Sequence, residues 1–260
     1  LADIYNGKEP EHFDSMRAVS SWFEAAKQSR LFIEAEAYWK KTAEMAKSFK
    51  PVTVPDVPDK KWRFISAGAE TPAKWLDELC SLYGATRYEI LYAAFHKMLA
   101  REYGDTVITG TASNLRTLAP LKQAAGCLAY RTFVMTENSR APFGKLAGEI
   151  KESVAKSQLY ALTAPRTVID PECTDYPIYM FNYWSEGAGT KATLFGEAAL
   201  GECAIVGEEY AAIPMVLHIS DQKEKISVGA LARGGLFSEA ALSEICADYI
   251  NTLEIIKNSR

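Results

Sequence analysis

Hydrophobic residues return at helical spacing in several segments of this chain. Between residues 13 and 47 apolar positions recur every three or four residues, and the pattern breaks near Ser29 and Arg30, which predicts two consecutive helices. The most continuous stripe comprises six apolar residues and ends before Gly104: Ile90, Leu91, Ala94, Phe95, Met98 and Leu99. This stripe predicts a helix with one face buried in the core.

Three further helices are expected from caps and spacing. Thr71 and Pro72 stand where a cap and a first helical residue belong, which predicts a helix that ends at Gly84. Apolar spacing predicts a helix of about five turns after Pro142, and a last helix after Ser238.

Six short segments have the composition of β-strands. They are residues 62–66, 105–111, 127–135, 177–183, 214–219 and 225–231, and the last two flank residues 221–224 like the arms of a hairpin. Helices and strands mix without a strict βαβ rhythm. We therefore expect an α/β (α+β) fold, in which helices pack on a mixed sheet.

Composition narrows the function classes. The 260 residues are 48% hydrophobic and 24% charged with a net charge of −4, so the chain can bury a sizeable core. It has no run of Lys and Arg, which argues against nucleic acid, and no apolar stretch near the ~18 residues of a membrane span. The five cysteines lack a CxxC pair, which predicts reduced thiols, no metal site and a cytoplasmic setting.

Five segments, in order, resemble sequence elements of one enzyme family. Residues 38–41 read YWKK, 89–95 EILYAAF, 107–116 VITGTASNLR, 125–133 AGCLAYRTF and 180–183 MFNY. They are similar to the YWK, LLAAF, VVGTPVAxR, IGxFVNTL and FNY elements of condensation domains of nonribosomal peptide synthetases. The likeness covers almost the whole chain.

The resemblance implies one lobe of a two-lobed, chloramphenicol acetyltransferase-like enzyme. In that family a tunnel between the lobes receives the phosphopantetheine arms of two carrier proteins, and the HHxxxDG signature of the N-terminal lobe supplies the catalytic histidine. Here His12, His96 and His218 stand singly, so the signature is absent. Residues 1–9 resemble the stretch that follows it.

We therefore expect residues 1–50 to be a helical lead-in after a missing N-terminal lobe, and residues 51–260 to be the C-terminal condensation-type lobe. The expected partners are the N-terminal lobe and peptidyl carrier proteins. No cofactor is expected to bind directly, no catalytic residue is assigned to this chain, and the chain alone is expected to be inactive.

The chain also departs from the family pattern. Ala112 and Ser113 replace the Pro-Val of GTPVAxR, and Ala129 and Tyr130 replace the Val-Asn of FVNTL. The HQDLPFEKL segment is hardly recognisable between residues 157 and 171. Three alternatives stay open: a condensation lobe that is inactive alone, a lobe of a CoA- or carrier-dependent O- or N-acyltransferase, and a non-catalytic docking module. An epimerization domain fits less well, because no EGHGRE-like sequence surrounds Arg116.

Seven residues are candidates for the tunnel or the contact between lobes: Arg116, Asn114, Tyr130, Asn182, Tyr183, Trp184 and His218. The resemblance implies that Arg116 faces the signature's aspartate across the lobes, while the alternative is a surface charge. Strand alternation sets His218 on the face opposite Leu217 and Ile219. There the ring either faces a cleft or is bonded to a hydrogen-bond partner as an ordinary structural histidine. The three residues at 182–184 line the tunnel or belong to the core. His96 is expected at the polar edge of its helix.

Overall fold

The computed structural model describes residues 16–46, 49, 64–117, 121–122, 124, 128–161, 163, 179–185, 194–195, 198–199, 214–233 and 236–259. Its described helices are α2 (Met16–Ala26), α3 (Arg30–Ala46), α4 (Leu76–Tyr83), α5 (Arg87–Tyr103), the short 3-10 helix η1 (Leu115–Thr117), α6 (Phe143–Leu159) and α8 (Glu239–Asn258). The strands are β1 (Phe64–Pro72), β2 (Val107–Asn114), β3 (Ala129–Thr136), β4 (Tyr179–Ser185), β5 (Leu194–Phe195), β6 (Ala198–Ala199), β7 (Met215–Asp221) and β8 (Lys225–Arg233).

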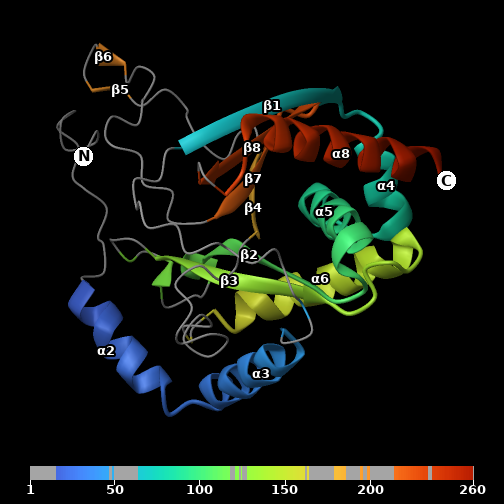
Figure 1. Ribbon diagram of the computed structural model, residues 1–260. Helices are drawn as coiled ribbons and strands as arrows, with labels where there is room; N and C mark the ends of the chain where they lie inside the picture. The colour runs from blue at the N-terminus through green and yellow to red at the C-terminus, as the bar shows by residue number, and fades with distance from the viewer. Residues whose placement is uncertain are drawn as a thin grey trace.

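The main sheet has the strand order β1-β8-β7-β4-β2-β3, and β5 pairs with β6 separately. β2, β4 and β7 run parallel to one another, whereas β1, β8 and β3 pair antiparallel with their neighbours. Helices pack on this sheet, with α5 and α8 beside β4, β7 and β8 (Figure 1). The mixed sheet with packed helices confirms the expected fold class.

Most helix predictions are confirmed, because local signals agree with the packing. The break at residues 29–30 separates α2 from α3. Thr86 and Glu89 form a reciprocal capping box at the start of α5, and Gly104 ends that helix. Ser238 caps α8 through a side-chain bond to the Ala241 N–H.

The helix predicted from Thr71 is wrong at its start. Thr71 and Pro72 instead end β1, where they pair with Ile226 and Lys225 of β8, and α4 begins only at Leu76. Pairing along the whole length of β8 outweighs the local capping signal, and a proline is tolerated because β1 lies at the sheet edge. Gly84 does end α4, in the left-handed conformation with φ 58°.

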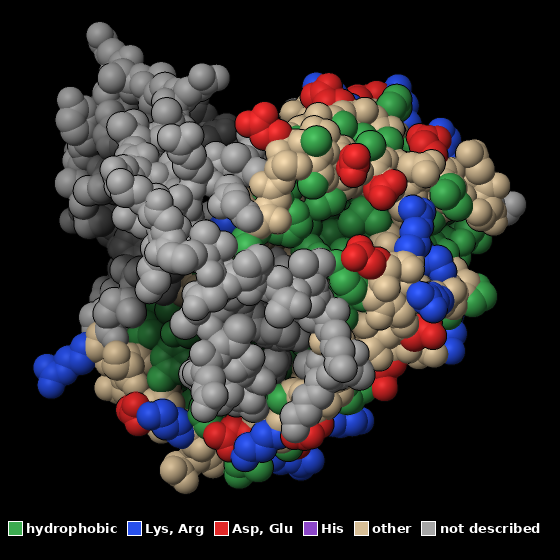
Figure 2. Space-filling view, viewed as in Figure 1, with side chains coloured by type: hydrophobic (Ala, Val, Ile, Leu, Met, Phe, Trp, Pro, Cys, Tyr) green, Lys and Arg blue, Asp and Glu red, His purple; other side chains and the backbone are tan. Residues whose placement is uncertain are grey.

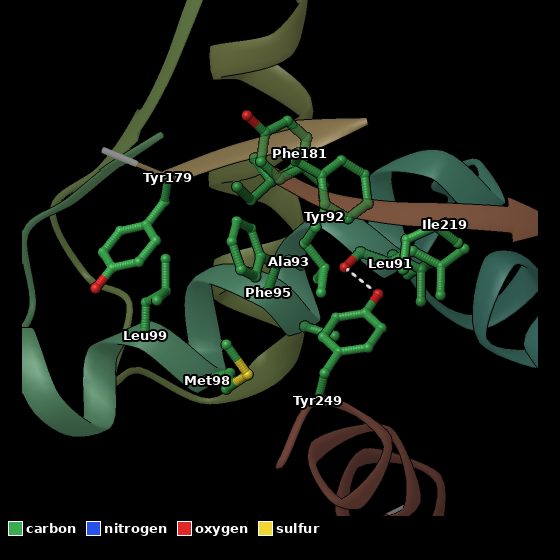
Figure 3. Close-up of a cluster of buried hydrophobic side chains, with 14 of the residues drawn as sticks. Leu91, Tyr92, Ala93, Phe95, Met98, Leu99, Tyr179, Phe181, Ile219 and Tyr249 are labelled. Atoms are coloured by element: carbon green, nitrogen blue, oxygen red, sulfur yellow. Dashed lines mark hydrogen bonds between the residues drawn. The ribbon is translucent and has the colours of Figure 1, made fainter. Parts of the chain in front are cut away.

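The main core lies between α5, α8 and the inner face of the sheet (Figure 3). The ring of Tyr92 stacks on Phe181 of β4, with centroids 4.4 Å apart. Phe95 packs between Phe181 and Tyr249 of α8. The Tyr249 hydroxyl donates to the Leu91 carbonyl oxygen at 2.9 Å, so α8 is joined to α5 by a hydrogen bond as well as by packing.

His96 lies inside this core, so its expected place at the polar edge of α5 is wrong. Its side chain is fully buried, with Nδ1 2.8 Å from Thr136 Oγ1 and Nε2 2.8 Å from Thr109 Oγ1. Strands β2 and β3 supply these hydroxyls and cover the side of α5 that the sequence pattern leaves polar. Burial lowers the pKa of His96 to about 3, so the ring is neutral at physiological pH.

The N-terminal helices join the rest of the fold through one buried residue of each helix, Trp39 and Val19. Trp39 of α3 is fully buried in the main core, and its Nε1 donates to the Tyr160 carbonyl oxygen at 2.9 Å. Val19 of α2 packs in a second, smaller cluster with Leu115 and Leu128. The α3 helix and the sheet therefore share one core.

Two of the five cysteines lie among the described residues. Cys80 and Cys246 are free thiols, whereas Cys127, Cys173 and Cys203 lie outside the described residues. Residues 1–9, which resemble the stretch after the signature, also lie outside them. None of the described helices is long and apolar enough to cross a membrane.

Candidate functional site

The two faces of the central strands differ in burial and chemistry. Along β7, Met215, Leu217 and Ile219 are buried against the helices, while Val216, His218 and Ser220 are half-buried on the opposite face. Along β7, this opposite, outer face carries small and polar side chains. Strand alternation produces the difference, because successive side chains point to opposite sides of a sheet.

Three parallel strands place candidate residues on the outer face, from the middle of β4 and β7 to the end of β2. Asn182 of β4 pairs with His218 of β7, and Trp184 lies two residues farther along the same face of β4. Gly110 of β2 pairs with Met180 of β4, so Asn114, four residues on, faces the same side. The carboxyl ends of parallel strands are where open α/β sheets commonly bind ligands.

Asn182, Trp184 and His218 form what we call the outer-face cluster. Asn182 Nδ2 donates to His218 Nδ1 at 3.2 Å. The Trp184 ring centroid lies 6.0 Å from that of His218, and the Trp184 side chain is 56% exposed. Partial burial lowers the pKa of His218, which favours the neutral ring.

This geometry restricts what His218 can do. Because the amide nitrogen of Asn182 can only donate, Nδ1 of the ring accepts, and the single ring proton sits on Nε2. The ring therefore offers an N–H donor beside an exposed indole. Its basic lone pair is already occupied, so the cluster is better suited to bind a carbonyl oxygen than to remove a proton.

Tyr183 faces the other side of the sheet from its neighbours. Its hydroxyl donates to Asp221 Oδ2 at 2.8 Å, and burial raises its pKa. Asp221 is buried and also accepts two bonds from Arg87, at 2.8 and 3.0 Å, which ties α5 to the end of β7. Tyr183 thus belongs to a buried ion-pair network and is not brought together with the outer-face cluster.

Asn114, Arg116 and Tyr130 lie around the end of β2. Asn114 Oδ1 accepts from the Arg116 backbone N–H at 3.0 Å, and Arg116 Nη2 donates to the Ala124 carbonyl oxygen at 3.0 Å. Tyr130 packs in the second cluster, 6.3 Å from the ring of Phe23. The half-buried Arg116 guanidinium is therefore held against its own loop, while its role between lobes stays a prediction.

The outer face also carries an ion pair that the sequence analysis does not identify. Glu70 of β1 accepts from Lys225 and Ser227 of β8, both at 2.9 Å. The Lys225 side chain lowers the pKa of Glu70. Alternation along residues 64–72 could have placed Glu70 on the exposed face, but its partners follow only from the β1–β8 register. No cluster of metal-ligating side chains occurs among the described residues.

Comparison with known proteins places this geometry in context. No family model matches the sequence. The chain is 28% identical over 163 residues to tyrocidine synthase 2 of Brevibacillus parabrevis, a match that covers 59% of this chain and 4% of that protein. The chain thus spans a small part of this relative.

Solved structures with the same fold include condensation domains, an X-domain and an epimerization domain. The condensation domain from the monacolin K polyketide synthase has a TM-score of 0.76 at 17% identity, over 99% of this chain and 64% of that one. The X-domain in its complex with OxyB from teicoplanin biosynthesis has a TM-score of 0.73 at 15% identity, over 94% and 56%.

The epimerization domain of the third module of tyrocidine synthetase B has a TM-score of 0.72 at 14% identity, over 99% of this chain and 63% of that one. In each case nearly all of this chain matches less than two thirds of the solved structure. The chain therefore has the fold of condensation domains.

Proposed function

We propose that this chain is the C-terminal lobe of a nonribosomal peptide synthetase condensation domain, and that its outer sheet face forms one wall of the substrate tunnel. The observation that carries this proposal is the outer-face cluster, Asn182, Trp184 and His218, on two neighbouring parallel strands of a condensation-type sheet. The chain matches 56 to 64% of the length of the three solved structures, which is consistent with one lobe plus connecting segments.

In this proposal the chain positions substrates and does not activate them. Amide formation needs an amine held close to a thioester carbonyl, and holding two tethered reactants in line can supply most of the rate. The Nε2–H of His218 binds an amide carbonyl of a phosphopantetheine arm, and the exposed indole of Trp184 shields the arm from water. The facing lobe contributes the HHxxxDG histidine.

Carrier proteins deliver the acyl groups as thioesters, so the chain itself binds no cofactor. Arg116, at the end of β2, takes part in the contact with the facing lobe. The free thiols of Cys80 and Cys246 support a cytoplasmic setting, because such a compartment keeps thiols reduced.

Reconstitution tests the proposal directly. The chain is mixed with the protein segment encoded upstream of Leu1, and carrier-bound aminoacyl thioesters are assayed for amide product by mass spectrometry. We expect product with both proteins together and none with the chain alone. Turnover by the chain alone, or an upstream segment without HHxxxDG, contradicts the proposal.

Substitutions at Arg116 and His218 then test which residues contact the facing lobe and which line the tunnel. Arg116→Ala should weaken binding between the two proteins, whereas Lys40→Ala, an exposed position on α3, should not. His218→Ala should lower turnover about two- to tenfold, which corresponds to one hydrogen bond of 0.5–1.5 kcal/mol. Equal turnover for His218→Ala and the wild type would remove the cluster from the tunnel.

A non-catalytic docking module is the second candidate. It is favoured by the fold likeness to the X-domain, which has been solved in a complex with OxyB. The reconstitution separates the two candidates, because a docking module would pair with its neighbours and form no amide.

A further inference from the structure

A groove of about 790 Å³ opens between the ends of the helices, away from the outer sheet face. The C-terminal parts of α5 and α8, the start of α6 and the last residue of α4 form its walls. We call it the basic groove, after its three cationic side chains, Lys97, Arg101 and Arg140. Figure 2 shows Lys and Arg gathered beside hydrophobic side chains at the right of the molecule, where Figure 1 places α4, α6 and the end of α8.

The cations of the groove are bonded to neutral oxygens. Lys97 Nζ donates to the carbonyl oxygens of Arg140 and Ala141, at 2.8 and 2.7 Å. Arg101 Nη2 donates to Thr252 Oγ1 at 2.8 Å, and Arg140 Nε donates to the Ala100 carbonyl oxygen at 2.9 Å. These bonds fix the cations in place without an ion pair to a carboxylate, although the charge of Asp105 also acts on Lys97.

Carboxylates are missing from the lining of the groove. None of its described lining residues is Asp or Glu, and the ion pairs of the described residues include none of the three cations. The Asp105 carboxylate binds the backbone N–H of Arg140, not a cationic side chain. Three positive charges therefore converge in a chain whose net charge is −4.

Apolar side chains lie between and beside these cations. Tyr83, Phe143 and Ile256 line the groove, and Ile255 lines it while 49% exposed. Leu82, next to Tyr83, is 61% exposed. Arginines combined with aromatic and exposed aliphatic side chains are typical of protein interfaces. A pocket for a small ligand usually encloses most of the ligand's surface, so exposed residues such as Ile255 and Leu82 would make no contact with such a ligand.

We propose that the basic groove docks an acidic, amphipathic helix of a protein partner. Apolar side chains of that helix pack against Phe143 and Ile255, and its carboxylates face Lys97, Arg101 and Arg140. The groove is built from α4, α5, α6, α8 and the loop before α6, and none of its lining residues belongs to the sheet. The proposal is thus independent of the tunnel function of the outer sheet face, and either can fail without the other.

A designed peptide tests the occupant. A synthetic helix of about 18 residues, with Leu at i, i+3, i+4 and i+7 and Glu elsewhere, is titrated into the full 260-residue chain by isotope-edited NMR. We expect shifts at groove residues, about tenfold weaker binding when Lys replaces Glu, and weaker binding as salt rises.

Matched variants decide whether the peptide binds in the basic groove. Arg101→Glu and Ile255→Ser should each weaken binding about fivefold or more. Lys40→Glu and Ile33→Ser, both at exposed positions on α3, should leave it unchanged. Because Ile255 is half-exposed, the Ile255→Ser variant stays folded. It therefore still tests the groove if Arg101→Glu unfolds the protein.

Three results would overturn the proposal: absence of peptide binding, binding that the groove variants do not weaken, and binding of decanoate in the groove in place of the peptide. The last result would assign the groove to a small amphiphilic anion.

Discussion

Acid should destabilise this fold through His96. The ring is fully buried, and burial lowers its pKa from 6.5 to about 3. Between those two values the unfolded chain binds a proton that the folded chain does not. The contribution of neutral His96 to the free energy of unfolding is therefore fully present above about pH 6.5. Below that pH it falls by about 1.4 kcal/mol for each pH unit. From pH 7 to pH 5, His96 alone should remove about 2 kcal/mol of unfolding free energy.

The measurement compares the wild type with His96→Gln. Urea unfolding followed by tryptophan fluorescence gives the free energy of unfolding at pH 7 and at pH 5. Other groups titrate in both proteins, including His218, so they cancel in the difference. We expect the wild type to lose about 2 kcal/mol more than the variant. If both proteins lose the same free energy, His96 does not stay neutral in the fold and the argument is refuted.

Four further substitutions test the packing. Asp221→Ala should cost about 3–5 kcal/mol, because it leaves the Arg87 guanidinium without its buried partner. Asp77→Ala, which removes an exposed partner of Arg87, should cost less than about 1 kcal/mol; equal losses in urea unfolding would contradict the distinction. Gly84→Ala should cost about 1 kcal/mol, because alanine is strained at φ 58°, and an unchanged thermal melt would refute this. Trp184→Ala should change stability by less than about 0.5 kcal/mol, and a larger loss in the same melt would place the indole in the core.

The elements that the sequence predicts correctly are those whose signals are local. The α5 helix combines a continuous apolar stripe, a capping box at Thr86 and Glu89, and a terminating glycine at position 104. Each signal lies within the helix or at its ends, so no distant partner can reverse it. The hairpin of β7 and β8 is predicted for the same reason, since its two arms are neighbours in the chain.

The wrong predictions arise where a strand far away in the sequence determines the secondary structure or the burial of a residue. Thr71 and Pro72 have the local signature of a helix start, but β8, more than 150 residues later, pairs with them as a strand. His96 follows an apolar stripe and so reads as a polar edge, but Thr109 and Thr136 of two strands enclose it. Neither contact leaves a trace in the local pattern.

The candidate site divides in the same way. Alternation correctly sets His218 on the face opposite Leu217 and Ile219, and the same rule separates Tyr183 from Asn182. What alternation cannot reveal is that β4 lies parallel to β7 in the register that bonds Asn182 to His218. The bond that settles the ring tautomer of His218 depends on that register.

By itself, the sequence determines where most helices and strands form and which face of each is apolar, because periodicity and caps are properties of neighbouring residues. Only the tertiary structure decides which strands lie side by side, which polar residues are buried with partners, and how cations from α5 and the loop before α6 meet in one groove. Those outcomes depend on contacts between residues far apart in the chain, whose free energy exists only once the whole sheet and its helices have assembled.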